Sequence, residues 1–303
     1  MRKVPFALYD AFSDLPFGGS QAAIVTDAAE LDTATRRNIA RELGMPATVF
    51  VDGYGHGWVS AQFMSAVMEL PMCGHGTVCL LTRLVEPGYM TWNREGAYAV
   101  DLRLPVGRAG VELTVDTGGR VQVMLEVKPP LPARFPADRV ALSALLGCGD
   151  DDLSEDLPVE IVHGDFEHLV VPVNGLEAIR RIKPDLQGMV HFCNQNNIET
   201  IAVCCLETER PDSTVHVRDF CPAVGVAESA GAGTTNAAVA AYLVSHGRVK
   251  PDSRGKIEIT AEQGHEIGRP GSIHTVIQMK DDRLPRLQVG GVATKVMEGH
   301  LLI

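Results

Sequence analysis

The chain has 303 residues, of which 45% are hydrophobic and 21% charged, so its length corresponds to two domains or one large one. The apolar content excludes a disordered chain. The formal charge of −11 argues against binding to nucleic acid or to an anionic membrane surface, because both partners attract basic patches.

Cysteine usage and the N-terminus indicate the compartment. The seven cysteines are odd in number and include no CxxC pair, which is typical of reduced thiols. The N-terminus leads into an alternating strand pattern and not into a signal peptide, and no apolar run reaches the roughly 20 residues of a membrane-spanning helix. We therefore expect a cytoplasmic protein. Cys73, His75 and Cys79 are the nearest candidate metal ligands, but they lie in a glycine-rich turn, so no metal is expected.

The first half predicts strands, two helices and a meander. The expected strands are 4–10, 22–27, 49–52 and 58–64, and the meander comprises 98–104, 111–116 and 121–127. One helix is capped by Asp32 or Thr33 and ends at Gly44. A second runs from about 78 to 85.

The second half follows a proline cluster at 129–136, which predicts a linker. Helices are expected at 137–146, near 176–182, and through 244 in an alanine-rich segment. The expected strands are 159–163, 169–173, 189–192, 198–205, 215–220, 256–262, 272–279, 287–289 and 292–297.

Each half contains a strand, a loop that ends Gly-x-Gly-Thr, and an apolar helix. The loops are Cys73-Gly74-His75-Gly76-Thr77 and Gly231-Ala232-Gly233-Thr234. This repetition predicts two related lobes. A glycine-rich turn that opens a helix presents unpaired backbone N–H groups, which bind anions such as a carboxylate. Neither loop has the spacing of a nucleotide-binding motif.

Cys73 and His75 are the candidate reactive groups. A helix N-terminus lowers a thiol pKa, so this pair suits proton abstraction next to a carboxylate without a cofactor. The alternative is that Cys73 is a small packed residue and His75 orders the loop. Cys79, Cys204 and Cys205 fall on apolar segments and are expected to be core thiols.

Five motifs, in order, resemble the PhzF-like (phenazine biosynthesis-like) family, which shares its fold with diaminopimelate epimerase and proline racemase. They are 10–19 (DAFSDLPFGG), 63–77 (FMSAVMELPMCGHGT), 218–222 (RDFCP), 263–264 with 268–270 (QG and GRP), and 289–291 (VGG).

The resemblance implies an α+β fold of the diaminopimelate epimerase type, with two topologically similar lobes and the active site between them. Each lobe is a mostly antiparallel sheet wrapped around a central helix. We expect an N-terminal lobe of 1–128 plus about 282–303 and a C-terminal lobe of 129–281. Family members are cofactor-independent isomerases or epimerases and commonly homodimers, so we expect no cofactor, a small carboxylate substrate and a homodimer.

Departures from the family pattern narrow the expected chemistry. The family's catalytic Glu aligns with Ala47 and its Asp with Ser229, while the second cysteine of two-base epimerases aligns with Ala230. An acid/base residue is then expected on only one face of a substrate carbon, which disfavours epimerisation. The resemblance therefore favours a shift of a proton and a double bond. Such isomerases occur in pathways to the 4-alkylproline units of lincosamide, hormaomycin and pyrrolobenzodiazepine antibiotics.

The expected catalytic residues are Cys73 and His75. The expected substrate-binding residues are Gly74, Gly76, Thr77, Ser229, Gly233, Thr234 and Thr235. Glu69 and Glu228 are second-rank candidates, beside Ala47 at the position of the absent family Glu. Two alternatives stay open: a racemase, epimerase or dehydratase of the same fold, and a small-ligand binding protein that has lost catalysis.

Overall fold

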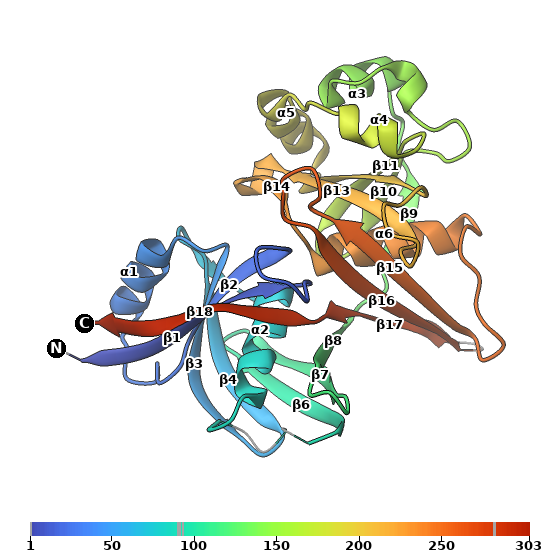
Figure 1. The fold of residues 1–303 in the computed structure, drawn as a ribbon. Helices are drawn as coiled ribbons and strands as arrows, with labels where there is room; N and C mark the ends of the chain where they lie inside the picture. Colours follow the sequence, from blue (N-terminus) through green and yellow to red (C-terminus); the bar gives the residue numbers. More distant parts are fainter. Residues whose placement is uncertain (1, 90–91, 93, 281–282) are drawn as a thin grey trace. The chain divides into compact units, whose positions relative to one another are not determined.

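The computed structural model describes residues 2–89, 92, 94–280 and 283–303 of the chain (Figure 1). The chain divides into unit 1, Met1–Glu126 with Gly290–Ile303, and unit 2, Val127–Val289. The expected lobe boundary at 281–282 lies outside the described residues.

Unit 1 is built on one mixed sheet. Its strands pair in the order β18, β1, β2, β3, β4, β6, β7, β8, with the short β5 also beside β4. Among these pairings, β2–β3 and β4–β6 are parallel and the others are antiparallel. The elements are β1 (Lys3–Ala11), β2 (Ser20–Val25), α1 (Thr33–Leu43), β3 (Ala47–Gly55), β4 (Trp58–Met64), β5 (Glu69–Leu70), α2 (Gly74–Val85), β6 (Gly96–Leu104), β7 (Gly107–Val115), β8 (Val121–Val127) and β18 (Ala293–Leu302).

The two helices of unit 1 differ in burial. α1 begins where Asp32 accepts a hydrogen bond from the Thr35 N–H and ends at Gly44 in the left-handed conformation, as the sequence predicts. It packs one apolar stripe on the sheet. α2 is buried from Gly76 through Leu81, including both faces of the helix. A helix that is apolar all round belongs in a core, so α2 is the central helix of unit 1.

Unit 2 repeats this plan. Its strands pair in the order β9, β10, β11, β12, β13, β15, β16, with β14 beside β13. Among these pairings, β11–β12 and β13–β15 are parallel and the others are antiparallel. The elements are β9 (Leu131–Arg134), α3 (Arg139–Leu146), η1 (Asp150–Asp152), β10 (Glu160–His163), β11 (Glu167–Pro172), α4 (Leu176–Arg181), α5 (Leu186–Asn196), β12 (Thr200–Cys205), β13 (Val215–Cys221), η2 (Pro222–Val224), β14 (Val226–Ser229), α6 (Gly233–Ser245), β15 (Lys256–Gln263) and β16 (Gly271–Lys280). β17 (Arg283–Gly291) leads the chain back to unit 1.

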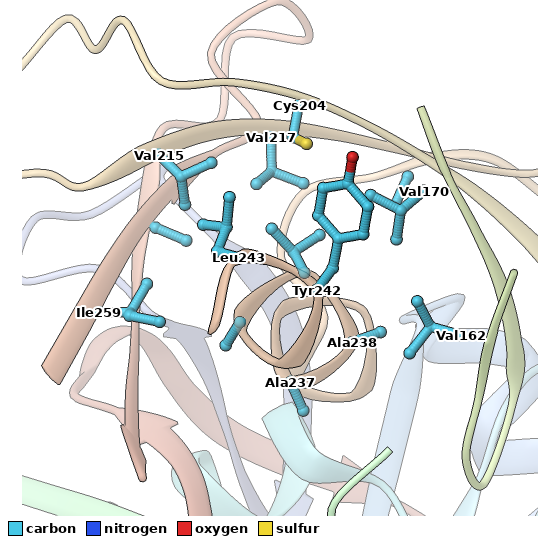
Figure 2. Close-up of a cluster of buried hydrophobic side chains, with 14 of the residues drawn as sticks. Val162, Val170, Cys204, Val215, Val217, Ala237, Ala238, Tyr242, Leu243 and Ile259 are labelled. Carbon is cyan, nitrogen blue, oxygen red and sulfur yellow. The ribbon is translucent and has the colours of Figure 1, made fainter. Parts of the chain in front are cut away.

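The core of unit 2 forms around α6. Figure 2 shows Tyr242, Leu243 and the alanines of α6 among valines of the surrounding strands. Alternate residues of β12 serve two layers: Cys204 packs with α6, whereas Cys205 packs with the outer helices α3, α4 and α5. Both cysteines and Cys79 of α2 are buried, which confirms their prediction as core thiols.

The two units share one topology. In each, an α-helical connection joins the first parallel pair, and a short strand followed by the central helix joins the second. β5 and α2 of unit 1 thus correspond to β14 and α6 of unit 2. The expectation of two similar lobes, each with a sheet around a central helix, is confirmed.

Two predicted elements of unit 2 are wrong. The segment 189–192, expected as a strand, lies within α5. Asp185 accepts a hydrogen bond from the Gly188 N–H, Asn197 ends the helix in the left-handed conformation, and Met189 and Cys193 form its buried stripe. Part of the proline cluster expected as a linker forms β9, in which Pro132 lies opposite Val162 of β10. Proline is tolerated there because an edge strand leaves one row of N–H positions unpaired.

Candidate functional site

The N-terminus of α2 carries Cys73 and His75. Cys73 is the N-cap residue, and its Sγ accepts a hydrogen bond from the Gly76 N–H at 3.4 Å. The same sulfur lies 3.4 Å from Nδ1 and 3.5 Å from Nε2 of His75. The helix therefore begins four residues earlier than predicted, and this start brings thiol and imidazole together.

Both groups of the pair are neutral. Burial raises the pKa of Cys73 to about 12, although backbone N–H groups of Gly76 and His75 act in the opposite direction. The expectation that the helix N-terminus lowers this pKa is wrong, because desolvation of the thiolate outweighs the helix. Burial also lowers the pKa of His75 to about 4. A neutral imidazole can accept a proton, and a neutral thiol can donate one.

The other residues of this loop are engaged within it. Thr77 is fully buried, and its Oγ1 donates to the Cys73 carbonyl at 2.8 Å. A Cβ on Gly76 would stand 3.1 Å from the Phe63 ring and 3.2 Å from Cys73 Sγ, so a larger residue there would have to displace the ring or the thiol. Gly74 is half-buried and faces open space.

The N-terminus of α6 is built differently. Its N-cap residue is Ala232, which provides no side-chain cap among the described residues. The first intrahelical bond is made by the Asn236 N–H to the Ala232 carbonyl. The N–H groups of Gly233, Thr234 and Thr235 precede it, at the positive end of the helix. This geometry suits a carboxylate.

The helix starts also correct the alignment of the two loops. α2 begins at Gly74 and α6 at Gly233, so Ala232, and not Ala230, corresponds to Cys73. By the same correspondence Thr234 takes the place of His75. Neither residue of unit 2 has a thiol or an imidazole, so unit 2 carries no second Cys–His pair at this position.

The segment that leads into α6 is held by Gln263 and Arg218, two polar residues of the family-like motifs to which the sequence analysis gave no role. Gln263 donates from Nε2 to the Ser229 carbonyl at 2.8 Å and accepts from Asn236 Nδ2 at 2.7 Å. Glu228 receives two hydrogen bonds from Arg218, at 2.9 and 2.8 Å. The second-rank candidate Glu228 is thus an ion-pair partner, and Ser229 is half-buried in β14.

Two further candidates of unit 1, Ala47 and Glu69, make no contact with the Cys73 sulfur among the hydrogen bonds described above. Ala47, at the position of the absent family Glu, opens β3 and is fully buried opposite Ala22 of β2. Glu69 is exposed in β5. Within the described part of the chain, no hydrogen bond or ion pair joins either side chain to His75.

Asp219 is the main group that sequence reasoning missed. It follows Val215 and Val217 on the α6 face of β13 and is 1% exposed. Thr235 Oγ1 donates to its Oδ2 at 2.8 Å. Burial raises the pKa of Asp219 to about 7. The sequence did contain a signal for this residue: Asp219 stands at the next alternate position after Val215 and Val217, where a buried apolar side chain is expected.

Within the described part of the chain, no group of three or more His, Cys, Asp or Glu side chains could hold a metal ion. None of the described helices combines the length and apolarity that crossing a membrane requires.

Comparisons with known proteins cover nearly the whole chain. The family described as "Phenazine biosynthesis-like protein" (PhzC-PhzF) matches residues 9–299. An "Uncharacterized isomerase" of Deinococcus radiodurans is 28% identical over 97% of this chain and 93% of its own length. A trans-2,3-dihydro-3-hydroxyanthranilate isomerase of Pseudomonas fluorescens is 26% identical over 98% and 99%.

Solved structures show the same fold. The PhzF-family phenazine biosynthesis protein of Bacillus anthracis superimposes with a TM-score of 0.89 and 25% identity, over 100% of both chains. A hydroxyproline epimerase from Agrobacterium vitis, solved with trans-4-hydroxy-L-proline, has a TM-score of 0.62 at 13% identity, over 99% of this chain and 91% of its own. The second likeness concerns the fold alone.

Proposed function

Because the chain belongs to the PhzC-PhzF, or phenazine biosynthesis-like, family and is an isomerase as its curated relatives are, we propose that it shifts a proton and a double bond in a small carboxylate-bearing, amino-acid-derived compound. The observation that carries this proposal is the contact between Cys73 Sγ and His75 at 3.4 Å, with both groups neutral. Such a pair moves protons without a cofactor.

The proposed step balances as follows. Neutral His75 removes a proton from a substrate carbon, and the C–H electron pair forms the new double bond. The electrons of the old double bond take up a proton at the far carbon. That proton comes from the imidazolium itself or from the Cys73 thiol, which the imidazolium then reprotonates. The α6 N–H groups of Gly233, Thr234 and Thr235 are proposed to hold the substrate carboxylate.

The substrate class follows from what the site lacks. Ala47 and Ser229 replace the family's carboxylates, and Ala232 corresponds to Cys73, so a strong second base is absent from these positions. A substrate that is already activated by conjugation or an imine needs less basicity. We therefore propose a 4-substituted, proline-like intermediate of secondary metabolism as the finer assignment. By resemblance to the family we also propose a cytoplasmic homodimer.

The test measures, by ¹H NMR in D₂O, how fast carbon-bound protons of a substrate exchange with solvent deuterium in the presence of the protein. Suitable probes are trans-2,3-dihydro-3-hydroxyanthranilate and a pyrroline-2-carboxylate with an exocyclic double bond. We expect His75→Gln to slow exchange by about 100-fold or more and Cys73→Ala by roughly tenfold, because they remove the base and the proton donor. Wild-type exchange should stay level down to about pH 5, since His75 is neutral above that range.

Matched controls are His56→Gln, an exposed histidine of unit 1, and Cys148→Ala, a half-buried thiol of unit 2. Both should keep wild-type exchange. Equal exchange in wild type, His75→Gln and Cys73→Ala would refute the assignment of the pair. Loss of optical rotation in an L-amino acid panel would indicate a racemase instead, and tight ligand binding without exchange would indicate a binding protein.

A further inference from the structure

Asp219 lies beneath the N-terminus of α6. Val215 and Val217 precede it on the same face of β13 and pack into the core around α6 (Figure 2). Asp219 continues this row one step further, where the helix begins, and contacts the third helical residue, Thr235. The carboxyl is therefore buried one side chain away from the N–H groups proposed to bind the substrate carboxylate.

The surroundings of Asp219 leave a negative charge poorly balanced. Burial of Asp219 outweighs the hydroxyls of Thr235 and Thr200, which favour its ionised form; Oδ2 accepts from Thr235, and Oδ1 has no partner of good hydrogen-bond geometry among the described residues. Arg218 is engaged elsewhere, with Glu228 and with the carbonyls of Ile179 and Ile182. The polar and titratable groups that act on Asp219 or adjoin it are Thr200 of β12, Cys221 of β13, Glu228 of β14 and Thr235 of α6. Behind Thr200 lies His168 of β11, whose Nδ1 is 2.7 Å from Thr200 Oγ1.

No cation stands in that set, and Glu228 adds a second negative charge. Burial also lowers the pKa of His168 to about 4, so this imidazole is neutral. The N-terminal end of α6 is then the main positive feature available to an ionised Asp219. A substrate carboxylate would need the same feature.

The duplicated topology shows that a carboxyl is not required here. In unit 1 the third residue of α2 is Gly76, and the ring of Phe63 in β4 lies against it. An apolar residue therefore serves the same place in the repeated fold. Asp219 incurs a desolvation cost that Phe63 avoids, which points to a role beyond packing.

We infer that Asp219 is a positioning residue that couples carboxylate binding at the α6 N-terminus to the uptake of one proton. When Asp219 is protonated, the helix end is available to the ligand; when Asp219 is ionised, the two carboxylates repel each other across Thr235. This inference rests on the proposed function, because it assumes that the α6 N-terminus binds the substrate carboxylate.

The direction of the pH dependence follows. Burial places the pKa of Asp219 at about 7 in the empty site. A bound carboxylate favours the protonated form still more, so that binding takes up a proton at and above neutral pH. Affinity should be greatest below pH 7 and should fall, by roughly tenfold, between pH 6 and pH 9.

The experiment is calorimetric titration of the full chain with anthranilate between pH 6 and pH 9, in pairs of buffers with different ionisation enthalpies. The buffer dependence reports the protons taken up. Asp219→Asn mimics the protonated carboxyl and should bind at every pH as wild type binds at pH 6, with no proton uptake. Glu160→Gln, which alters a buried acid that meets His246 at the other end of α6, should keep the wild-type dependence. Binding of uncharged anthranilamide should show neither the pH dependence nor the proton uptake.

A second measurement needs no ligand. The ¹³C shift of the Asp219 carboxyl, assigned by comparison with Asp219→Asn, should titrate near pH 7 and move upward when anthranilate is added. Binding of anthranilate with the same pH dependence in wild type and Asp219→Asn overturns this inference alone. Titration of Asp219 below pH 5 also overturns it. Failure of anthranilate to bind at any pH counts against both the carboxylate site and the inference drawn from it.

Discussion

At the scale of single residues, Gly76 controls the environment of the Cys73 sulfur. Its N–H donates to Sγ, and its missing side chain leaves room for both the thiol and the Phe63 ring. Gly74, two residues earlier and the first residue of the same helix, borders open space. The two glycines therefore provide a matched pair in which only one is sterically required.

We expect Gly76→Ala to lower the free energy of unfolding by roughly 1–3 kcal/mol, because the new methyl group must displace the thiol or the ring. Gly74→Ala should be neutral or stabilise by about 0.5–1 kcal/mol through reduced chain entropy. Urea unfolding monitored by circular dichroism measures both. Equal stability of the two variants would contradict the steric role of Gly76.

At the scale of elements, the loop that leads into α6 depends on its neighbour after β15. Gly264 has a φ of +86°, and a Cβ there would stand 2.7 Å from the Ala230 carbonyl oxygen and 2.4 Å from that of Arg269. Gly268 has a similar φ of +71° but no atom within 4 Å of such a Cβ. Both glycines carry the same conformational demand, and only Gly264 touches the loop.

Gly264→Ala should therefore cost roughly 2–4 kcal/mol of stability, against about 1 kcal/mol for Gly268→Ala. Because Ala230 precedes the α6 N-terminus, Gly264→Ala should also raise KM more than it lowers kcat. Steady-state kinetics beside thermal unfolding separates the two effects. If Gly268→Ala shifts KM equally, backbone strain and not the contact with Ala230 is responsible.

Most elements and the contact between Cys73 and His75 could be predicted from sequence, for identifiable reasons. Asp32 and Gly44 delimit α1 by local chemistry alone, and Cys73 and His75 are only two positions apart in the chain. The environment of Asp219 could not be predicted from sequence, because Thr235, Thr200 and Glu228 act on it from three other elements. The pKa of Cys73 was expected in the wrong direction, since sequence shows the helix end but not the burial that outweighs it.

At the scale of the whole molecule, buried charge should shape the pH dependence of stability. His216 lies between Glu262 and Glu266, at 2.7 and 2.9 Å. Although burial opposes its charge, these two carboxylates raise the pKa of His216. Burial likewise opposes the charge of both glutamates, but hydrogen bonds, from His216 and from backbone N–H groups, lower their pKa values.

The directions of these pKa shifts define the pH range in which the folded protein is most stable. The His216 contribution is complete below the unfolded-state pKa near 6.5 and is lost as pH rises through the raised folded value. The glutamate contributions are complete above about pH 4.5 and are lost as pH falls. Asp219, whose folded pKa lies above its unfolded value, lowers stability as pH rises from about 4 to 7. Stability should therefore peak near pH 5–6.

His216→Gln should remove much of the alkaline decline and cost roughly 3–5 kcal/mol at pH 6, because it removes the imidazolium between two buried carboxylates, of which only Glu266 also lies near Arg218. His163→Gln is the matched control, since His163 pairs with Glu167 at a more exposed position. Thermal unfolding from pH 4 to 9 provides the curves. Superimposable profiles for wild type and His216→Gln would show that this cluster does not set the dependence.

The pairing of β1 with β18 has a consequence for synthesis on the ribosome. β18 belongs to unit 1 but follows all of unit 2 in the sequence, and it covers one edge of β1. Unit 2 is a continuous segment and can complete its core while translation proceeds. Unit 1 begins first and finishes last, so its open strand edge must wait through the translation of unit 2, and it is there that a nascent chain is most exposed to aggregation or needs a chaperone.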